Sequence, residues 1–180
     1  EFIPTRWDSI YVGDIIKIHQ DEQAPADIVL LATSEDTGSG YIETCNLDGE
    51  TNLKTREALH TTCKITDFLN FKAKISCDPP NKLISVFNGN LEIDQYGNEG
   101  ENASSLEPNI GHQFSLNSKQ LVLRGSSLKN TEWAVGAVVY TGHETKIMMN
   151  SSSSRTKRSY LERGLNLKLI SIFIFLFLLS

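Results

Sequence analysis

YIETCNLDGETNLK, from Tyr41 to Lys54, is the stretch that says most about the fold and function of this chain. An alternating apolar and polar run leads into Asp48-Gly49-Glu50-Thr51, where a glycine lies between two acids. Glycine adopts backbone conformations that other residues avoid, so the chain can turn sharply here and approach a ligand closely. Carboxylates at the tip of an exposed turn can reach chemistry on another domain. Taken alone, an Asp-Gly-Glu tripeptide is more often a plain hairpin turn with solvated acids, so the surrounding sequence must decide.

Four segments outside this stretch favour the interpretation that the carboxylates of the turn act on another domain, over that of a plain hairpin turn. They are VGDIIKI, PADIVLLATSE, LRGSSLKNTEWAVGAVVYTGHETKIMMN and KRSYLE, at Val12–Ile18, Pro25–Glu35, Leu123–Asn150 and Lys157–Glu162. Together with YIETCNLDGETNLK, and in this order, they resemble the actuator domain of the type IV P-type ATPases, the phospholipid flippases. Asp48 and Thr51 match the lipid-transporting branch, because ion-pumping relatives carry Thr-Gly-Glu-Ser at this turn. Cys45 stands where alanine is more usual, and a small thiol is tolerated there.

The resemblance implies a catalytic cycle that is shared between domains. ATP phosphorylates an aspartate on a separate domain, and the actuator then rotates so that its turn meets the aspartyl phosphate. Glu50 is the implied catalytic residue, because a carboxylate can position the attacking water and accept its proton. Gly49 lets the turn approach the phosphoryl group, and Asp48 and Thr51 are expected to shape the turn through side-chain hydrogen bonds to the backbone.

The resemblance also implies cofactors and partners. ATP and Mg²⁺ would act in the full-length parent and bind on domains other than this one. The sequence has neither an Asp-Lys-Thr-Gly-Thr string for the phosphorylated aspartate nor a Walker A string, so we expect the fragment alone to be inactive. The implied partners are the phosphorylation and nucleotide-binding domains of the same chain, a phospholipid (an aminophospholipid by default) and an accessory two-span glycoprotein subunit.

Composition is that of a globular domain and argues against nucleic-acid binding. The 180 residues are 39% hydrophobic and 22% charged, with a net charge of −5. Five basic residues and one acid lie in residues 151–180, which leaves a net charge of −9 on the rest. A body this acidic lacks the basic footprint that nucleic acid requires. Cys45, Cys63 and Cys77 are widely spaced, so neither a zinc site nor a disulfide framework is expected.

Many short apolar runs separated by turns predict a mainly β fold, which the resemblance narrows to the distorted jelly-roll of an actuator domain. The predicted strands are Ile10–His19, Asp27–Thr33, Tyr41–Thr44, Lys72–Cys77, Leu83–Phe87, Leu91–Asp94, Gln120–Arg124 and Ala134–Tyr140, with Asn88-Gly89 as a hairpin turn. Good helix formers predict a short helix at Asn52–Leu59. Tyr96–His112 is polar and is expected to be an insertion loop. Lys54 and Arg56 are expected to be solvated charges.

The C-terminal stretch Leu165–Leu179 leaves two interpretations open. It is apolar apart from Asn166, Lys168 and Ser171, which fits either a buried amphipathic helix or the first part of a transmembrane helix. Because Ile172–Leu179 is apolar on every face, the membrane interpretation is favoured, and the preceding basic residues would then lie in the cytosol. We therefore expect an actuator domain at residues 1–150, a basic linker at 151–164 and the truncated start of a transmembrane helix at 165–180, in a plasma, Golgi or endosomal membrane.

Two other functions remain open at this stage. One is the actuator of an ion-transporting P-type ATPase, which the Asp48-Gly49-Glu50-Thr51 string disfavours. The other is a non-catalytic, membrane-anchored β-domain that binds proteins, in which Glu50 is an ordinary surface acid. The scattered residues His19, His60 and His112 do not suggest a metal site. Asp14 and Asp27 are expected to serve turns or strand ends, and Gly142-His143 is expected to be a turn.

Overall fold

A computed structural model of the chain describes residues 2–65, 67–68, 71–93, 112–151 and 160–179. Most of the regular structure in these ranges is β-strand. The strands are β1 (Ile15–His19), β2 (Asp27–Thr33), β3 (Ser39–Glu43), β4 (Lys54–Glu57), β5 (Ala73–Cys77), β6 (Gly89–Ile93), β7 (His112–Leu116), β8 (Leu121–Val122), β9 (Ser127–Lys129) and β10 (Trp133–Tyr140). The helices are the 3₁₀ turns η1 (Trp7–Ser9) and η2 (Gly142–Glu144), and α1 (Cys45–Asp48), α2 (Lys146–Asn150) and α3 (Tyr160–Leu179).

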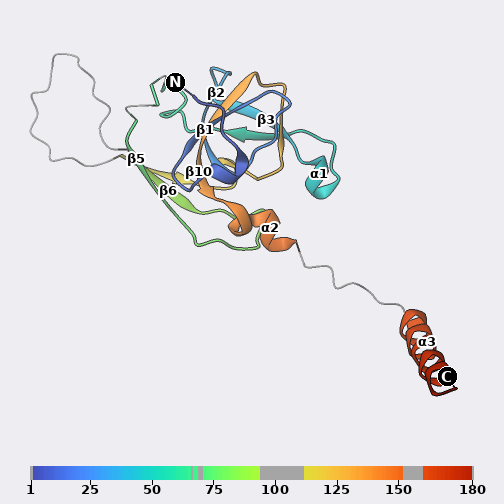
Figure 1. The fold of residues 1–180 in the computed structure, drawn as a ribbon. Helices are drawn as coiled ribbons and strands as arrows, with labels where there is room; N and C mark the ends of the chain where they lie inside the picture. Colours follow the sequence, from blue (N-terminus) through green and yellow to red (C-terminus); the bar gives the residue numbers. More distant parts are fainter. Residues whose placement is uncertain (1, 66, 69–70, 94–111, 152–159, 180) are drawn as a thin grey trace, which may run out of the picture.

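The strands form three antiparallel sheets. One sheet has the order β1-β10-β2-β8, the second has the order β4-β3-β9 and the third has the order β5-β6-β7. Figure 1 shows the third sheet and its connections on one flank of the body, and the short helix α1 at the edge of the body beside β3. Because β3 and β9 pair antiparallel while β9 lies far along the chain from β3, the second sheet ties the region before α1 to the C-terminal half of the chain.

The core lies on both faces of β2. Every residue of β2 is buried, as expected for a continuous apolar strand covered on two sides. Ile28 and Leu30 belong to one hydrophobic cluster, and Val29 belongs to a second, because successive side chains of a strand point to opposite faces. The first cluster includes Ile42 of β3, so it joins the first two sheets.

The second cluster joins the third sheet to β2, β8 and β10. It contains Phe87, Leu91, Ile93 and Leu116 from the third sheet and its connections, together with Val29, Leu121, Leu123, Val139 and Tyr140. The rings of Phe87 and Tyr140 meet edge to face at 6.3 Å between centroids, a favourable aromatic geometry. The third sheet is therefore part of the folded body.

The mainly β fold class is confirmed. Strands Asp27–Thr33 and Ala134–Tyr140 are confirmed with nearly the predicted bounds, and the first strand is shorter than predicted because it begins at Ile15. The jelly-roll topology and the three-part division into residues 1–150, 151–164 and 165–180 stay predictions. Of the insertion loop Tyr96–His112, only His112 lies within the described residues, and it begins β7.

The predicted helix at Asn52–Leu59 is wrong. Lys54–Glu57 form β4, which pairs antiparallel with β3. Residues in β4 alternate between partly buried and exposed, the period of a strand with one covered face. Helix propensity is a weak local preference, and here pairing with a distant strand overrides it.

The predicted strand Leu83–Phe87 and the hairpin at Asn88-Gly89 are also wrong. Leu83, Ile84 and Val86 are exposed and lie outside any strand. Gly89 is the first residue of β6 and pairs with Cys77 of β5. A side chain at Gly89 would lie 3.1 Å from the carbonyl oxygen of Ser76, so glycine is needed there for close strand approach and not for a turn.

Helix α3 contains the apolar C-terminal stretch and begins before it, at Tyr160. The side chains of Leu165, Leu169, Ile172, Phe175 and Leu179 in this helix are exposed. Within the described residues, no helix reaches the combination of length and apolar character needed to cross a membrane. The assignment of residues 165–180 to the start of a membrane span stays a prediction.

Candidate functional site

The Asp48–Thr51 turn follows a short helix that the sequence did not reveal. After β3 ends at Glu43, the backbone closes a single helical turn, α1, in which Leu47 N–H donates to Thr44 O at 2.8 Å. Gly49 ends this helix in the left-handed conformation, with φ 76° and ψ 2°, and its N–H donates to Cys45 O at 3.0 Å. A left-handed glycine is a common way to stop a helix, and it redirects the chain into Glu50.

Leu47 anchors the base of this turn to the body. Its side chain is half-buried and packs against the second core cluster. It also lies over Gly125, where an added Cβ would be only 3.2 Å from Cδ2 of Leu47. Gly125 has φ of +82°, a conformation that side chains disfavour. The turn is therefore seated on a closely fitted contact between α1 and the β8–β9 connection.

Glu50 lies at the exposed end of the turn and contacts Lys54. Oε2 of Glu50 lies 3.0 Å from Nζ of Lys54, and the two side chains are 59% and 32% exposed. Lys54 is the first residue of β4, which pairs with β3. The Glu50 carboxylate is therefore both open to solvent and tied to a strand of the second sheet.

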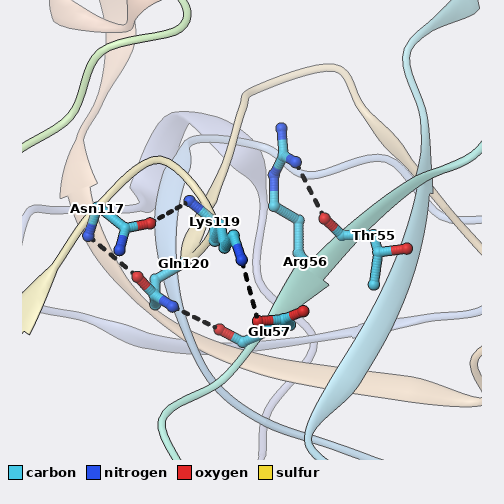
Figure 2. A network of polar contacts seen from close by, with 6 residues as sticks. All are labelled: Thr55, Arg56, Glu57, Asn117, Lys119 and Gln120. Atoms are coloured by element: carbon cyan, nitrogen blue, oxygen red, sulfur yellow. Dashed lines mark hydrogen bonds and ion pairs between the residues drawn. The ribbon is translucent and has the colours of Figure 1, made fainter.

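Arg56 and Glu57 continue β4 into a polar network with the Asn117–Gln120 turn, which Figure 2 shows. Lys119 Nζ lies 3.9 Å from Oε2 of Glu57, and Gln120 Nε2 donates to Glu57 O at 3.2 Å. Arg56 is half-buried, and its Nε donates to Leu121 O at 2.7 Å. Arg56 is thus not the solvated charge that its sequence suggests, because it is half-buried and donates to the backbone of β8.

The structure brings the four predicted site residues together in one segment. Asp48 ends α1 and Gly49 caps it, while Glu50 and Thr51 are exposed immediately after the cap. The side chain of Asp48 lies outside what the structure describes. Hydrogen bonding by Asp48 and Thr51 to the turn backbone stays a prediction.

Asp27 has a role that the sequence only partly indicated. It begins β2, is fully buried, and uses both carboxylate oxygens: Oδ1 accepts Arg124 N–H at 2.8 Å and Oδ2 accepts Lys146 N–H at 2.7 Å. Burial raises its pKa, and the two backbone hydrogen bonds oppose that rise. Asp27 therefore joins β2 to the β8–β9 connection and to the first residue of α2, which supports the expected strand-end role.

Lys146 is the buried partner of this junction that sequence reasoning missed. Its side chain is fully buried, and Nζ donates to Asn81 Oδ1 at 2.7 Å and to Leu83 O at 3.0 Å. Burial is the main cause of a lowered pKa for this amine. A lysine beside Thr145 in a polar string gives no local signal of burial, because the acceptors come from a segment about sixty residues away.

The other predicted turn and metal assignments are simpler. Asp14 Oδ2 accepts Tyr11 N–H at 2.8 Å, and Gly142 and His143 lie in the 3₁₀ turn η2. In the part of the chain that the structure describes, no three His, Cys, Asp or Glu side chains are grouped as metal ligands would be.

Glu50 presents an exposed carboxylate on a turn that Leu47 anchors to the core. This arrangement is suited to acting on a group supplied by another surface.

Similarity to known proteins extends over nearly the whole sequence. The chain is 43% identical over 180 residues to phospholipid-transporting ATPase 1 of Arabidopsis thaliana, and 40% identical over 182 residues to phospholipid-transporting ATPase tat-1 of Caenorhabditis elegans. It is 39% identical over 183 residues to phospholipid-transporting ATPase FetA of Mus musculus. These alignments cover 99%, 99% and 97% of the chain. No protein-family model matches it.

The same alignments cover only 14%, 15% and 14% of the three relatives. The chain thus matches a small part of much longer proteins, all of them named for phospholipid transport. The family resemblance drawn from the motifs is confirmed: the chain belongs, as a segment, to the type IV P-type ATPases.

Proposed function

We propose that residues 1–150 are the actuator domain of an ATP-driven phospholipid flippase, in which Glu50 drives hydrolysis of the aspartyl-phosphate intermediate. The observation that carries this proposal is the left-handed cap at Gly49, which ends α1 and leaves Glu50 exposed on a turn that is anchored to the core. Among the described residues, apart from the chain neighbours of Gly49, no heavy atom lies within 4 Å of the position of a Cβ at Gly49. The space beside the turn is thus open to a second protein surface.

Hydrolysis requires little from this chain beyond one well-placed carboxylate. In the proposed step, Glu50 accepts a hydrogen bond from a water molecule and orients its oxygen toward the phosphorus atom. The new oxygen–phosphorus bond forms as the bond between phosphorus and the aspartate oxygen breaks, and the water proton passes to Glu50. General base catalysis of this kind typically contributes about 10²–10⁴-fold to a rate.

Lys54 would keep the Glu50 carboxylate oriented between turnovers. Nζ of Lys54 lies 3.0 Å from Oε2 of Glu50, the distance of a direct ion pair. Both side chains are partly exposed, so Glu50 can leave Lys54 when a phosphorylated partner surface arrives. The pair therefore combines orientation with freedom to move.

The cofactors and partners belong to the same proposal. We place ATP and Mg²⁺ on other domains of the flippase, because the sequence of this chain contains neither an Asp-Lys-Thr-Gly-Thr string nor a Walker A string. The phosphorylation and nucleotide-binding domains, a phospholipid and an accessory subunit are the proposed partners. The jelly-roll topology and a membrane location, with residues 165–180 entering the bilayer, are part of this proposal.

The test uses a full-length flippase that carries this segment. Phosphoenzyme is formed with labelled ATP and chased with unlabelled ATP and phospholipid. In Glu50→Gln, we expect the acid-stable phosphoenzyme to persist about 10²–10⁴-fold longer than in the wild type. The matched control is Glu35→Gln, an exposed acid in the turn before β3, which should decay at the wild-type rate.

Two results would count against the proposal in different ways. Equal decay of wild type and Glu50→Gln would remove Glu50 from the chemistry while leaving the flippase assignment in place. An active transporter preparation that forms no phosphoenzyme would overturn the P-type mechanism, and a protein-binding β-domain would become the better interpretation.

A further inference from the structure

A cleft of about 290 Å³ lies behind the Asp48–Thr51 turn, and nothing in the proposed hydrolysis uses it. The segments that line it are far apart in the sequence. They are α1 with the residue before it, β4, the connection between β5 and β6, the turn before β8, the residue after β8, and α2. A cleft assembled from six separate segments keeps its shape only in the folded chain, as a binding site requires.

The charged side chains that the structure describes in the wall of this cleft are all positive. They are Lys54, Arg56 and Lys119. Glu50 and Glu57 contact Lys54 and Lys119, but neither glutamate lines the cleft. In a body with net negative charge, this local grouping of three cations is unusual, and it attracts anions.

Arg56 is the cation that would gain most from an anion. It is half-buried, its Nε donates to Leu121 O at 2.7 Å, and its guanidinium also donates to Thr55 O at 3.1 Å. Burial lowers the pKa of its guanidinium, because the charged form loses contact with water. Figure 2 shows Arg56, from β4, and Lys119, from the turn before β8, in the same network of polar contacts. An anion in the cleft would offset the desolvation of Arg56.

The rest of the wall is aliphatic with three hydroxyl-bearing residues. Leu47, Leu123 and Ile147 are half-buried or buried, and Ile84 is 46% exposed. Thr44, Ser85 and Ser118 add hydroxyl groups. A small apolar body can pack against the aliphatic side chains while an anionic head meets the cations.

We propose that this cleft binds a phosphomonoester, with the phosphate held by Arg56 and Lys119 and the carbon body packed against Leu47 and Ile147. A phosphate dianion suits the site better than a carboxylate, because it offers three acceptor oxygens to several cationic donors. The cleft lies next to the Glu50 turn but does not contain Glu50. The proposal therefore stands whether or not Glu50 is a catalytic residue.

The test is direct binding to the 180-residue chain, followed through backbone amide NMR shifts. The probes are phenyl phosphate, inorganic phosphate and phenol. We expect phenyl phosphate to bind saturably with a dissociation constant of about 1 mM, with the largest shifts at Leu47, Ser85, Lys119 and Ile147. We expect inorganic phosphate to bind several-fold more weakly and phenol not to bind.

Two sets of variants test whether the positively charged side chains of the cleft are responsible for binding phenyl phosphate. The double substitution Lys54→Gln with Lys119→Gln should weaken phenyl phosphate binding about tenfold. Ile84→Asp, which places an acid on an exposed part of the wall, should weaken it similarly without disturbing the core. Lys74→Gln is the matched control, since this exposed lysine lies on β5 and outside the cleft, and its binding should equal that of the wild type.

Four outcomes would overturn the proposal. The first three are the absence of saturable binding, shifts that map away from the cleft, and equal loss of binding in Lys74→Gln and in the double variant. Inorganic phosphate binding as tightly as phenyl phosphate would also overturn it, because the aliphatic wall would then contribute nothing.

Discussion

Lys54 Nζ and Glu50 Oε2 lie 3.0 Å apart across the segment that links α1 to β4. Lys54 pairs with Ile42 of β3, and Ile42 is almost completely buried. The position of the exposed Glu50 carboxylate is therefore coupled, through one ion pair and one strand pairing, to the first hydrophobic cluster.

Replacing Lys54 with glutamine separates the catalytic effect of this pair from its effect on stability. Exposed ion pairs contribute only about 0–1 kcal/mol, so we expect Lys54→Gln to unfold at nearly the wild-type denaturant concentration. In the full-length flippase we expect phosphoenzyme decay to slow about tenfold, because small losses of orientation are costly in catalysis. Lys74→Gln on β5 serves as the control. Decay at the wild-type rate in Lys54→Gln would show that the pair does not orient Glu50.

The close contact between Gly136 and strand β2 leads to a second prediction. It lies in β10 opposite Leu30, where the register between β10 and β2 shifts. A Cβ at this position would lie 2.9 Å from both Ile28 Cδ1 and Val29 O. The backbone oxygen cannot move away without breaking the sheet, so we expect Gly136→Ala to lower the free energy of unfolding by about 1–3 kcal/mol.

Denaturant unfolding of Gly136→Ala checks this expectation, and Gly13→Ala is a useful comparison. Gly13 has φ of +97° but no atom within 4 Å of its Cβ position. Its cost should come from backbone strain alone, about 1 kcal/mol. If Gly136→Ala were no worse than Gly13→Ala, the close contact with β2 would not be a real constraint.

The strands with strong local signals could be predicted from the sequence, and those made by distant pairing could not. Asp27–Thr33 and Ala134–Tyr140 are apolar runs that are buried on both faces. A short continuous apolar run is a recognisable strand signal in a sequence. Ser127–Lys129 is short and polar at its start, and it becomes β9 only because β3 pairs with it. Pairing with β3 also explains why Lys54–Glu57, which was expected to be helical, forms the strand β4.

The candidate site shows the same division. The Asp48-Gly49-Glu50-Thr51 string located the turn, because its chemistry is local. The half-buried Arg56 donates to Leu121 O in β8, 65 residues further along the chain. The residues next to Arg56 in the sequence do not indicate this contact. The cationic cleft therefore could not be predicted from the sequence and is seen only in the folded structure.

The buried hydroxyl group of Tyr140 leads us to expect a loss of stability at alkaline pH. Its hydroxyl group donates to Asp78 O at 2.6 Å, and burial is the main cause that raises its pKa above the ordinary 10.0. Because the folded pKa is raised, the stabilisation is fully present below the unfolded pKa and is lost as pH rises through the folded pKa. We therefore expect the wild type to lose stability above pH 10.0 more steeply than Tyr140→Phe.

Denaturant titrations of both proteins across this alkaline range provide the measurement. Near neutral pH, Tyr140→Phe should be less stable by about 1 kcal/mol, since one hydrogen bond is lost. That difference should shrink with increasing pH. A constant difference across the range would mean that ionisation of Tyr140 is not linked to folding.

Asp27→Asn tests the junction between β2 and α2. Both carboxylate oxygens of Asp27 accept backbone N–H groups, from Arg124 and Lys146. Asparagine has a single side-chain oxygen, so its amide NH₂ would face one of these two N–H donors. A buried donor without an acceptor costs about 1–3 kcal/mol, and we expect Asp27→Asn to be destabilised by that amount in denaturant unfolding near neutral pH.

The matched control for this substitution is Asp36→Asn, an exposed acid in the turn between β2 and β3, which should stay within about 0.5 kcal/mol of the wild type. Amide hydrogen exchange adds a local test, because the N–H groups of Arg124 and Lys146 should both be protected in the wild type. In Asp27→Asn, one of the two should exchange much faster while the other stays protected through the remaining oxygen. Equal protection of both amides in the variant would mean that Asp27 does not hold α2 against β2, and that the burial of Lys146 alone fixes this junction.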